Sequence, residues 1–297
     1  MQRVLLTGAS GFIGQYLLHA LQSPPFNTLY EVIALSAKSI AGCTTVVHNN
    51  YQINKEVFHS AGIHQIDIVI HAGAYTPKDR TRMNDNLNNT NIYNTESLLK
   101  ALPGKVQKFI YLSTLDVYAN TSNVITEESE VQPASLYGWS KLYCEKMISF
   151  WCEQQHVICQ MLRIGHIYGP GEEKYSKLIP IAITKILNNE RPEIINEGVE
   201  KRSFLNIRDC VQAILASIAL ESSKNIINIV SGKSYTVKEI IKMILELSGM
   251  SLEPIYRETV GTPRNLLFDS AKMEAILHKE MVDIRYGLEE EINGFRK

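Results

Sequence analysis

The sequence predicts an α/β fold with a doubly wound parallel sheet, and two observations support this prediction. Short, nearly continuous apolar segments alternate with longer amphipathic segments over residues 1–165. This alternation is typical of strands that are buried on both faces and connected by helices. A glycine-rich turn also lies between the first apolar segment and the first amphipathic one. Because crossovers between parallel strands are right-handed, helices are expected on both faces of the sheet.

The expected elements follow one another in order along the chain. Strands are predicted at Val4–Leu6, Glu31–Leu35, Thr44–Val47, Ile66–Ala72, Lys108–Ser113 and Val157–Ile164. Helices are predicted at Gln15–Gln22, at about Asn86–Ala101 and at about Leu136–Glu153. After Gly165 the alternation weakens, and one more helix is predicted at Thr236–Gly249. We therefore expect a Rossmann-like domain over residues 1–165 and a smaller C-terminal lobe over 166–297, with some segments of the lobe returning to the sheet.

Composition narrows the classes of function. Of 297 residues, 45% are apolar and 21% are charged, and the net charge of −1 offers no basic field for nucleic acid and no polybasic run for a membrane surface. No apolar run approaches the ~20 residues of a membrane-spanning helix, and no signal peptide is expected before the glycine turn. The cysteines lack metal-ligand spacing, so neither zinc nor a disulfide framework is expected. A cytoplasmic protein without a metal is predicted.

The glycine-rich turn predicts a dinucleotide site. Three glycines follow one another at intervals of three residues, in the order G-x-x-G-x-x-G. Glycine permits a sharp turn and lets a pyrophosphate approach the start of the following helix, where N–H groups and the helix dipole favour anions. The candidate cofactor-binding residues of this turn are Gly8, Gly11, Phe12, Ile13 and Gly14.

The end of the second predicted strand bears on the choice of cofactor. An acidic residue there normally binds the adenosine ribose hydroxyls, but this chain continues with Ser36 and Lys38. A hydroxyl beside an ammonium would accept a 2′-phosphate, whereas a carboxylate would repel it. The pair therefore favours NADP over NAD, although a solvated loop would have the same composition.

Tyr137 and Lys141 predict the acid/base of the reaction. Residues four apart share one face of a helix, so a phenol and an ammonium can address the same pocket, and the cation is expected to lower the pKa of the phenol. Tyr51 and Lys55 have the same spacing. Only the first pair follows the fifth predicted strand with its hydroxyls Ser113 and Thr114, so the second is interpreted as a surface pair.

Taken together, these motifs resemble the extended short-chain dehydrogenase/reductases, in particular their nucleotide-sugar epimerase/dehydratase group. Further matching segments are Ala72-Gly73-Ala74 after His71, Asn91–Thr95, Arg163–Gly171 and Arg202–Asp209. The resemblance extends from residue 4 to about residue 272.

The resemblance implies roles for individual residues. Tyr137 would be the acid/base, Lys141 would hold the nicotinamide ribose, and Thr114 would bind the reacting oxygen. The further cofactor-binding candidates are Ala72, Gly73, Ala74, Asn91 and Ser113. The substrate-binding candidates are Thr114, His166, Arg202 and Arg264, with Arg202 placed to grip a diphosphate.

The chain departs from the group's pattern at three positions. Dehydratases carry consecutive acidic residues after the threonine, whereas this chain has Leu115 and then Asp116. His166 replaces an asparagine and Asn94 replaces a glycine. Ser36 and Lys38 favour a 4-keto sugar reductase, whereas the rest of the pattern does not separate it from the alternative, a nucleotide-sugar epimerase that retains NAD. A further alternative is a reductase of a non-sugar carbonyl, which Arg202 disfavours. Another is a non-catalytic dinucleotide sensor, which the presence of Thr114, Tyr137 and Lys141 disfavours.

The predicted helix over Leu136–Glu153 indicates self-association. It carries more apolar surface than one core-facing stripe requires, at Leu142, Tyr143, Met147, Ile148, Phe150 and Trp151. In the family that the chain resembles, the corresponding helices pair in a two-fold dimer. A homodimer is therefore expected, unless another part of the same chain covers these residues.

Overall fold

The computed structural model describes residues 1–49, 53–78, 80–173, 175–222, 225–258, 265–278 and 280–296. The chain divides into two compact units. Unit 1 consists of Met1–Ala119, Glu130–Ile164 and Val211–Ile227. Unit 2 consists of Asn120–Ser129, Gly165–Cys210 and Asn228–Lys297.

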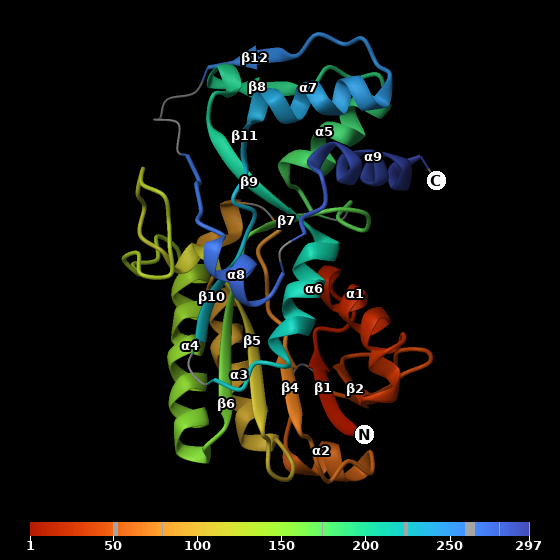
Figure 1. The fold of residues 1–297 in the computed structure, drawn as a ribbon, viewed down its shortest axis with the longest axis vertical. Helices are drawn as coiled ribbons and strands as arrows, with labels where there is room; N and C mark the ends of the chain where they lie inside the picture. The colour runs from red at the N-terminus through yellow and green to blue at the C-terminus, as the bar shows by residue number, and fades with distance from the viewer. Residues whose placement is uncertain are drawn as a thin grey trace. The chain divides into compact units, whose positions relative to one another are not determined.

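A seven-stranded sheet with the order β10-β6-β5-β4-β1-β2-β3 confirms the predicted α/β class (Figure 1). Its strands are β1 (Gln2–Thr7), β2 (Tyr30–Ser36), β3 (Thr44–Val47), β4 (Ile68–His71), β5 (Lys108–Thr114), β6 (Ile158–Ile164) and β10 (Asn225–Ile229). The neighbours from β6 to β3 all pair in parallel. Their carboxyl ends therefore share one edge of the sheet, where ligands bind in folds of this class.

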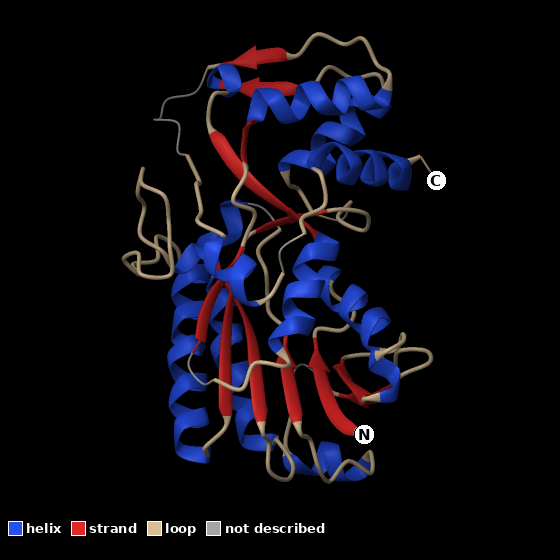
Figure 2. Cartoon of the chain, in the orientation of Figure 1, coloured by secondary structure: helices blue, strands red, loops and turns tan. Residues whose placement is uncertain are grey.

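Helices connect these strands, as Figure 2 shows. They are α1 (Phe12–Leu21), α2 (Lys55–Ser60), α3 (Thr90–Ala101), α4 (Leu136–Gln155) and α6 (Ile207–Ser217). A short 3-10 helix at Asn86–Asn89 precedes α3, so the predicted helix begins in the tighter form. Helices α2, α3 and α4 share one apolar core with the strands, to which each contributes a fully buried side chain, respectively Phe58, Leu98 and Ile148.

Helix α4 is tied to the sheet by a buried ion pair. The guanidinium of Arg163 on β6 donates to both carboxylate oxygens of Glu145, from Nε at 3.0 Å and from Nη2 at 2.8 Å. The same guanidinium lies 4.7 Å from the ring centre of Tyr118. A bidentate pair satisfies both charges inside the protein, and removing either partner would leave a buried charge uncompensated. The contact therefore fixes α4 against β6.

Unit 2 contains two small sheets. Strands β11 (Ser234–Thr236), β9 (Lys201–Asn206) and β7 (His166–Tyr168) form one, and β12 (Ile255–Arg257) with β8 (Glu193–Ile195) forms the other. Its helices include α5 (Leu178–Leu187), α7 (Val237–Ser248), α8 (Ala271–Ile276) and α9 (Ile284–Phe295). The sequence predicted α7 and missed the others. In α5 the run Leu-Ile-Pro-Ile-Ala-Ile obscures the helical period, and its proline is tolerated because it lies in the first turn.

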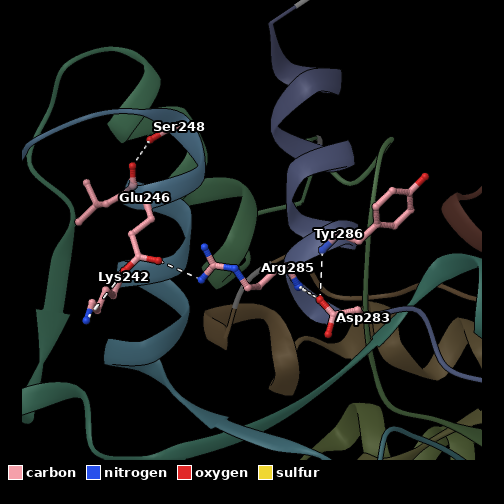
Figure 3. A network of polar contacts seen from close by, with 7 residues as sticks. Lys242, Glu246, Ser248, Asp283, Arg285 and Tyr286 are labelled. Atoms are coloured by element: carbon pink, nitrogen blue, oxygen red, sulfur yellow. Dashed lines mark hydrogen bonds and ion pairs between the residues drawn. The ribbon is translucent and has the colours of Figure 1, made fainter.

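Helices α7 and α9 of unit 2 are linked by polar contacts on their surface (Figure 3). Glu246 on α7 accepts from Arg285 on α9 at 2.9 Å and lies 3.8 Å from Lys242. Asp283 caps α9 by accepting the N–H groups of Arg285 and Tyr286. Because the ion-paired side chains are solvent-exposed, the pairs contribute little to stability, and the helices are held mainly by their apolar faces.

Within the described residues, no helix combines the length and the apolar character needed to span a membrane.

Candidate active site

The glycine turn between β1 and α1 is packed too closely for side chains. Gly8 has φ of +69°, and a Cβ there would lie 2.7 Å from the backbone N of Gly73. A Cβ at Gly14 would lie 2.0 Å from the carbonyl oxygen of Gly8. The first contact brings the glycine turn against the segment after β4, and the second brings α1 against the turn. Glycine is thus required at both positions.

The start of α1 suits an anion. Gly11 is the N-cap residue, no side chain caps the helix, and its first turn contains no acidic residue. The N–H groups of a first helical turn lack intrahelical acceptors and carry the positive end of the dipole. Phe12 is buried and Ile13 is half-buried, so these side chains pack while the backbone forms the helix start. The arrangement fits the pyrophosphate of a dinucleotide.

The end of β2 places Ser36 and Lys38 close together. Ser36 is buried, and its Oγ accepts the backbone N–H of Lys38 at 3.4 Å. The Lys38 side chain is exposed. Buried His48, which the sequence analysis did not single out, donates its N–H to the carbonyl oxygen of Ser36 at 3.1 Å. The backbone of Lys38 and of His48 is therefore held against Ser36, at the position where an acidic residue normally binds the ribose.

The structure brings two of the three predicted catalytic residues into direct contact. The phenol of Tyr137 hydrogen-bonds to the side chains of Thr114, at the end of β5, and Thr76, in the loop after β4. Thr114 also donates to a carboxylate oxygen of Asp116 at 3.2 Å. Thr76 was missed by the sequence analysis, because nothing in its local sequence indicates that the loop reaches the phenol.

The ammonium of the third residue, Lys141, bonds to the backbone of β5 and not to the phenol of Tyr137. Its Nζ donates to the carbonyl oxygen of Leu112 at 2.7 Å and lies 4.2 Å from the ring centre of Tyr111. Burial lowers the pKa of Lys141 to about 8, and negative charge on Cys144 and Glu145 opposes that shift. Lys141 is thus held by β5 and lies one helical turn beyond Tyr137.

The expectation that Lys141 lowers the pKa of Tyr137 is wrong for this structure. Burial raises the pKa of the phenol well above its ordinary value, and the charge of Asp116 raises it further. Hydrogen bonds to Thr76 and Thr114 oppose the shift. The ammonium does not offset the cost of burying a phenolate, so the phenol of Tyr137 stays protonated.

Gly138 explains how Tyr137 reaches these hydroxyls. A Cβ at this position would lie 2.3 Å from the carbonyl oxygen of Asp116 and 2.9 Å from the Cβ of Pro133. The start of α4 therefore rests on the turn that follows β5. Ser135 caps the helix there by accepting the N–H of Gly138 at 3.1 Å.

The loop after β4 is anchored from α3. Asn91 accepts the N–H of Tyr75 at 2.7 Å and donates to the Tyr75 carbonyl at 3.1 Å and to Ser140 Oγ at 3.1 Å. Asn91 therefore holds the loop that carries the half-buried Ala72–Ala74 segment. In contrast, the buried hydroxyl of Ser113 has no hydrogen-bond partner in the part of the chain that is described, as expected of a group that awaits a ligand.

Two predicted substrate residues lie in the three-stranded sheet of unit 2. His166 on β7 pairs in register with Phe204 on β9, and their rings are 6.3 Å apart. Arg202, two residues before Phe204, is mostly buried and donates to Glu200 at 2.8 Å. Arg264 lies outside the described residues, as does Tyr51 of the surface pair with Lys55.

Comparison with known proteins identifies the class. Residues 4–230 match the NAD dependent epimerase/dehydratase family, and the chain belongs to this family of enzymes. The resemblance in the sequence is thereby confirmed, and the fold agrees with it. The family includes nucleotide-sugar epimerases, dehydratases and reductases, as the following relatives show.

The chain is 29% identical over 253 residues to dTDP-4-dehydro-6-deoxyglucose reductase of Escherichia coli, covering 81% of this chain and 80% of that one. It is 29% identical over 261 residues to dTDP-D-glucose 4,6-dehydratase of Homo sapiens, covering 83% and 74%. The crystal structure of UDP-glucuronic acid 4-epimerase from Bacillus cereus, in complex with UDP-glucuronic acid and NAD, is similar with a TM-score of 0.85 and 25% identity over 99% of both chains.

Proposed function

We propose that the chain transfers a hydride between a nicotinamide dinucleotide and a carbon of a nucleotide-activated sugar. The observation that carries the proposal is the phenol of Tyr137, which bonds to Thr114 and Thr76 on the sheet edge that also carries the glycine turn. The relatives named above act on nucleotide sugars or bind them together with NAD, which supports the same substrate class.

Each candidate site residue contributes one part of this reaction. The glycine turn and the start of α1 bind the pyrophosphate, and Lys141 orients the nicotinamide ribose. Tyr137 gives a proton to the carbonyl oxygen during reduction, and Thr114 orients that oxygen. The guanidinium of Arg202 binds the substrate's diphosphate. A bound nicotinamide ring supplies or accepts the hydride.

Among the activities of the family, we propose ketone reduction. Leu115 stands where dehydratases carry the first of two acidic residues, and the one carboxylate present, Asp116, accepts the hydroxyl of Thr114. An epimerase is the second candidate, because the similarity to UDP-glucuronic acid 4-epimerase covers 99% of both chains.

The amount of dinucleotide consumed distinguishes the two. A panel of nucleotide sugars and their 4-keto forms is first screened by thermal shift with NAD, NADH, NADP and NADPH. With the best pair, a reductase oxidises one NADPH for each sugar converted. An epimerase interconverts two sugars with no net change in nicotinamide absorbance. Absence of stabilisation by every dinucleotide would contradict the proposal as a whole.

For the cofactor we propose NADP. The chain has Ser36 and Lys38 at the end of β2, where an acidic residue would repel a 2′-phosphate, and this supports the proposal. Calorimetry should show tighter binding of NADPH than of NADH, and Ser36→Asp should reverse the order by charge repulsion. Ser36→Ala is the matched control, since it removes the hydroxyl without adding charge. Tighter binding of NADH by the unaltered chain would reject NADP and favour the epimerase.

A further inference from the structure

His71, which has no part in the reaction described above, lies in a chain of hydrogen bonds under the sheet edge. It is the last residue of β4 and pairs in register with Thr7, the last residue of β1. Its Nδ1 lies 2.7 Å from Oγ1 of Thr7, and its Nε2 lies 3.0 Å from Oγ1 of Thr95 on α3. All three side chains are buried.

The imidazole is neutral and is therefore not an acid/base of the reaction. Burial lowers the pKa of His71 to about 3, and the positive charge of Lys141 lowers it further. A neutral imidazole has one donor and one acceptor nitrogen, which match one threonine hydroxyl on each side. Because His71 is buried, loss of either hydroxyl would leave a ring nitrogen without its partner.

These bonds hold the loop after β4 at several points. The hydroxyl of Thr7 also accepts the N–H of Gly73 at 2.8 Å, the residue that meets Gly8 of the glycine turn. On α3, Asn91 and Thr95 are four residues apart and share one face. Asn91 binds Tyr75 near the end of the loop, while Thr95 binds His71 at its start.

We propose that His71 and Thr95 are positioning residues that hold the loop 72–76 for dinucleotide binding. His71 bonds to Thr7 across β1 and β4, and Thr7 in turn holds the N–H of Gly73. Gly73 is thereby kept against Gly8 of the glycine turn. The same loop ends at Thr76, which bonds to the phenol of Tyr137. The inference rests on the proposed function only in that a dinucleotide binds at the glycine turn.

The test compares two substitutions of Thr95 that differ in one hydroxyl. Thr95→Val keeps the size and removes the hydrogen bond to His71, whereas Thr95→Ser keeps the bond and removes a methyl. Calorimetric dissociation constants for NADPH and NAD are measured together with thermal unfolding. Thr95→Val should raise the dissociation constant about tenfold, the usual effect of one buried hydrogen bond. Thr95→Ser should remain within about twofold of the unaltered chain.

A control separates positioning from general destabilisation. Ile33→Val removes a methyl from a fully buried residue of β2, away from the loop. It should lower the unfolding temperature and leave dinucleotide affinity unchanged. Equal affinities of Thr95→Val and the unaltered chain would overturn the inference, as would a loss with Ile33→Val as large as that with Thr95→Val. If the unaltered chain binds no dinucleotide, the proposed function fails instead.

Discussion

At the scale of single residues, the ionisation of Tyr137 is set by its immediate surroundings. Burial and the charge of Asp116 both disfavour the phenolate, and the hydroxyls of Thr76 and Thr114 favour it. In a reductase the neutral phenol is the active form, because it supplies the proton. Reduction should therefore persist to alkaline pH and fall once the phenol ionises.

Asp116→Asn tests this balance. Removing the negative charge favours the phenolate, so the pKa of Tyr137 falls and the alkaline limb of the kcat profile for ketone reduction moves to lower pH. The profile is measured over the whole range in which the variant stays folded. Glu128→Gln, on an exposed site, is the control and should leave the limb in place. A limb that stays unmoved or moves to higher pH in Asp116→Asn would refute the assignment of the limb to Tyr137.

Residue types and spacing indicated the glycine turn and the pair Tyr137 and Lys141, and the resemblance to the family added the role of Thr114. They did not predict Thr76 or His71, because the contacts of these residues arise from packing across separate elements. The pKa of Tyr137 was also mispredicted. Spacing places an ammonium near a phenol, but the extent of burial and the partner that the ammonium takes depend on the folded chain.

At the scale of elements, α9 carries a buried acid that should make unit 2 sensitive to pH. Glu291 is fully buried, and burial raises its pKa to about 9. Negative charge on Glu172 and Glu173 raises it too, while a backbone hydrogen bond from Gly169 and the charge of Lys177 oppose the shift. The pKa of Glu172 is itself raised, to about 7, mainly by burial.

The sign of the resulting pH dependence follows from proton linkage. Between the ordinary value near 4.5 and about 9, the folded chain holds a proton on Glu291 that the unfolded chain releases. The contribution to the free energy of unfolding is therefore complete below this window and is lost as pH rises through it. Glu291→Gln keeps the neutral shape, so its unfolding temperature should exceed that of the unaltered chain increasingly from pH 6 to pH 9. Parallel curves for the two proteins would exclude this role.

The elements themselves were predicted well where apolar strands alternate with helices, as in β1 to β6. Prediction failed for α5 and α9. The first is apolar on most faces, and the second, Ile284–Phe295, has Gly287 within it and few apolar residues. Glycine is needed there because a Cβ would lie 2.2 Å from the hydroxyl of Tyr168, a contact between distant segments that no local pattern reveals.

At the scale of the whole molecule, we predict a homodimer from the exposed aromatic side chains of α3 and α4. Leu142 and Ile148 are buried in unit 1, whereas Tyr143 is 58% and Phe150 is 67% exposed. Tyr93 on the neighbouring helix α3 is 65% exposed. Large exposed aromatic side chains on adjacent helices are typical of a protein interface. A two-fold contact would bury the same patch on both copies of the chain.

Light scattering at micromolar concentration tests the dimer. The unaltered chain should have about twice the mass of 33.5 kDa that one chain has. Tyr143→Glu combined with Phe150→Glu should yield the single-chain mass, because it places two charges in each copy of the interface. Tyr256→Glu, at an exposed tyrosine of unit 2, should leave the mass unchanged. A single-chain mass for the unaltered protein would reject the interface.

Tyr137, as the proton carrier of a dinucleotide-dependent reaction, is central to the proposed function. Tyr137→Phe keeps the ring in its buried site and removes the hydroxyl that bonds to Thr114 and Thr76. The most direct measurement is turnover of the best nucleotide sugar by this variant, with dinucleotide affinity determined on the same preparation. We expect kcat to fall roughly 10²–10⁴-fold, with nearly unchanged dinucleotide affinity. Turnover within a few-fold of the unaltered enzyme would contradict this role of Tyr137.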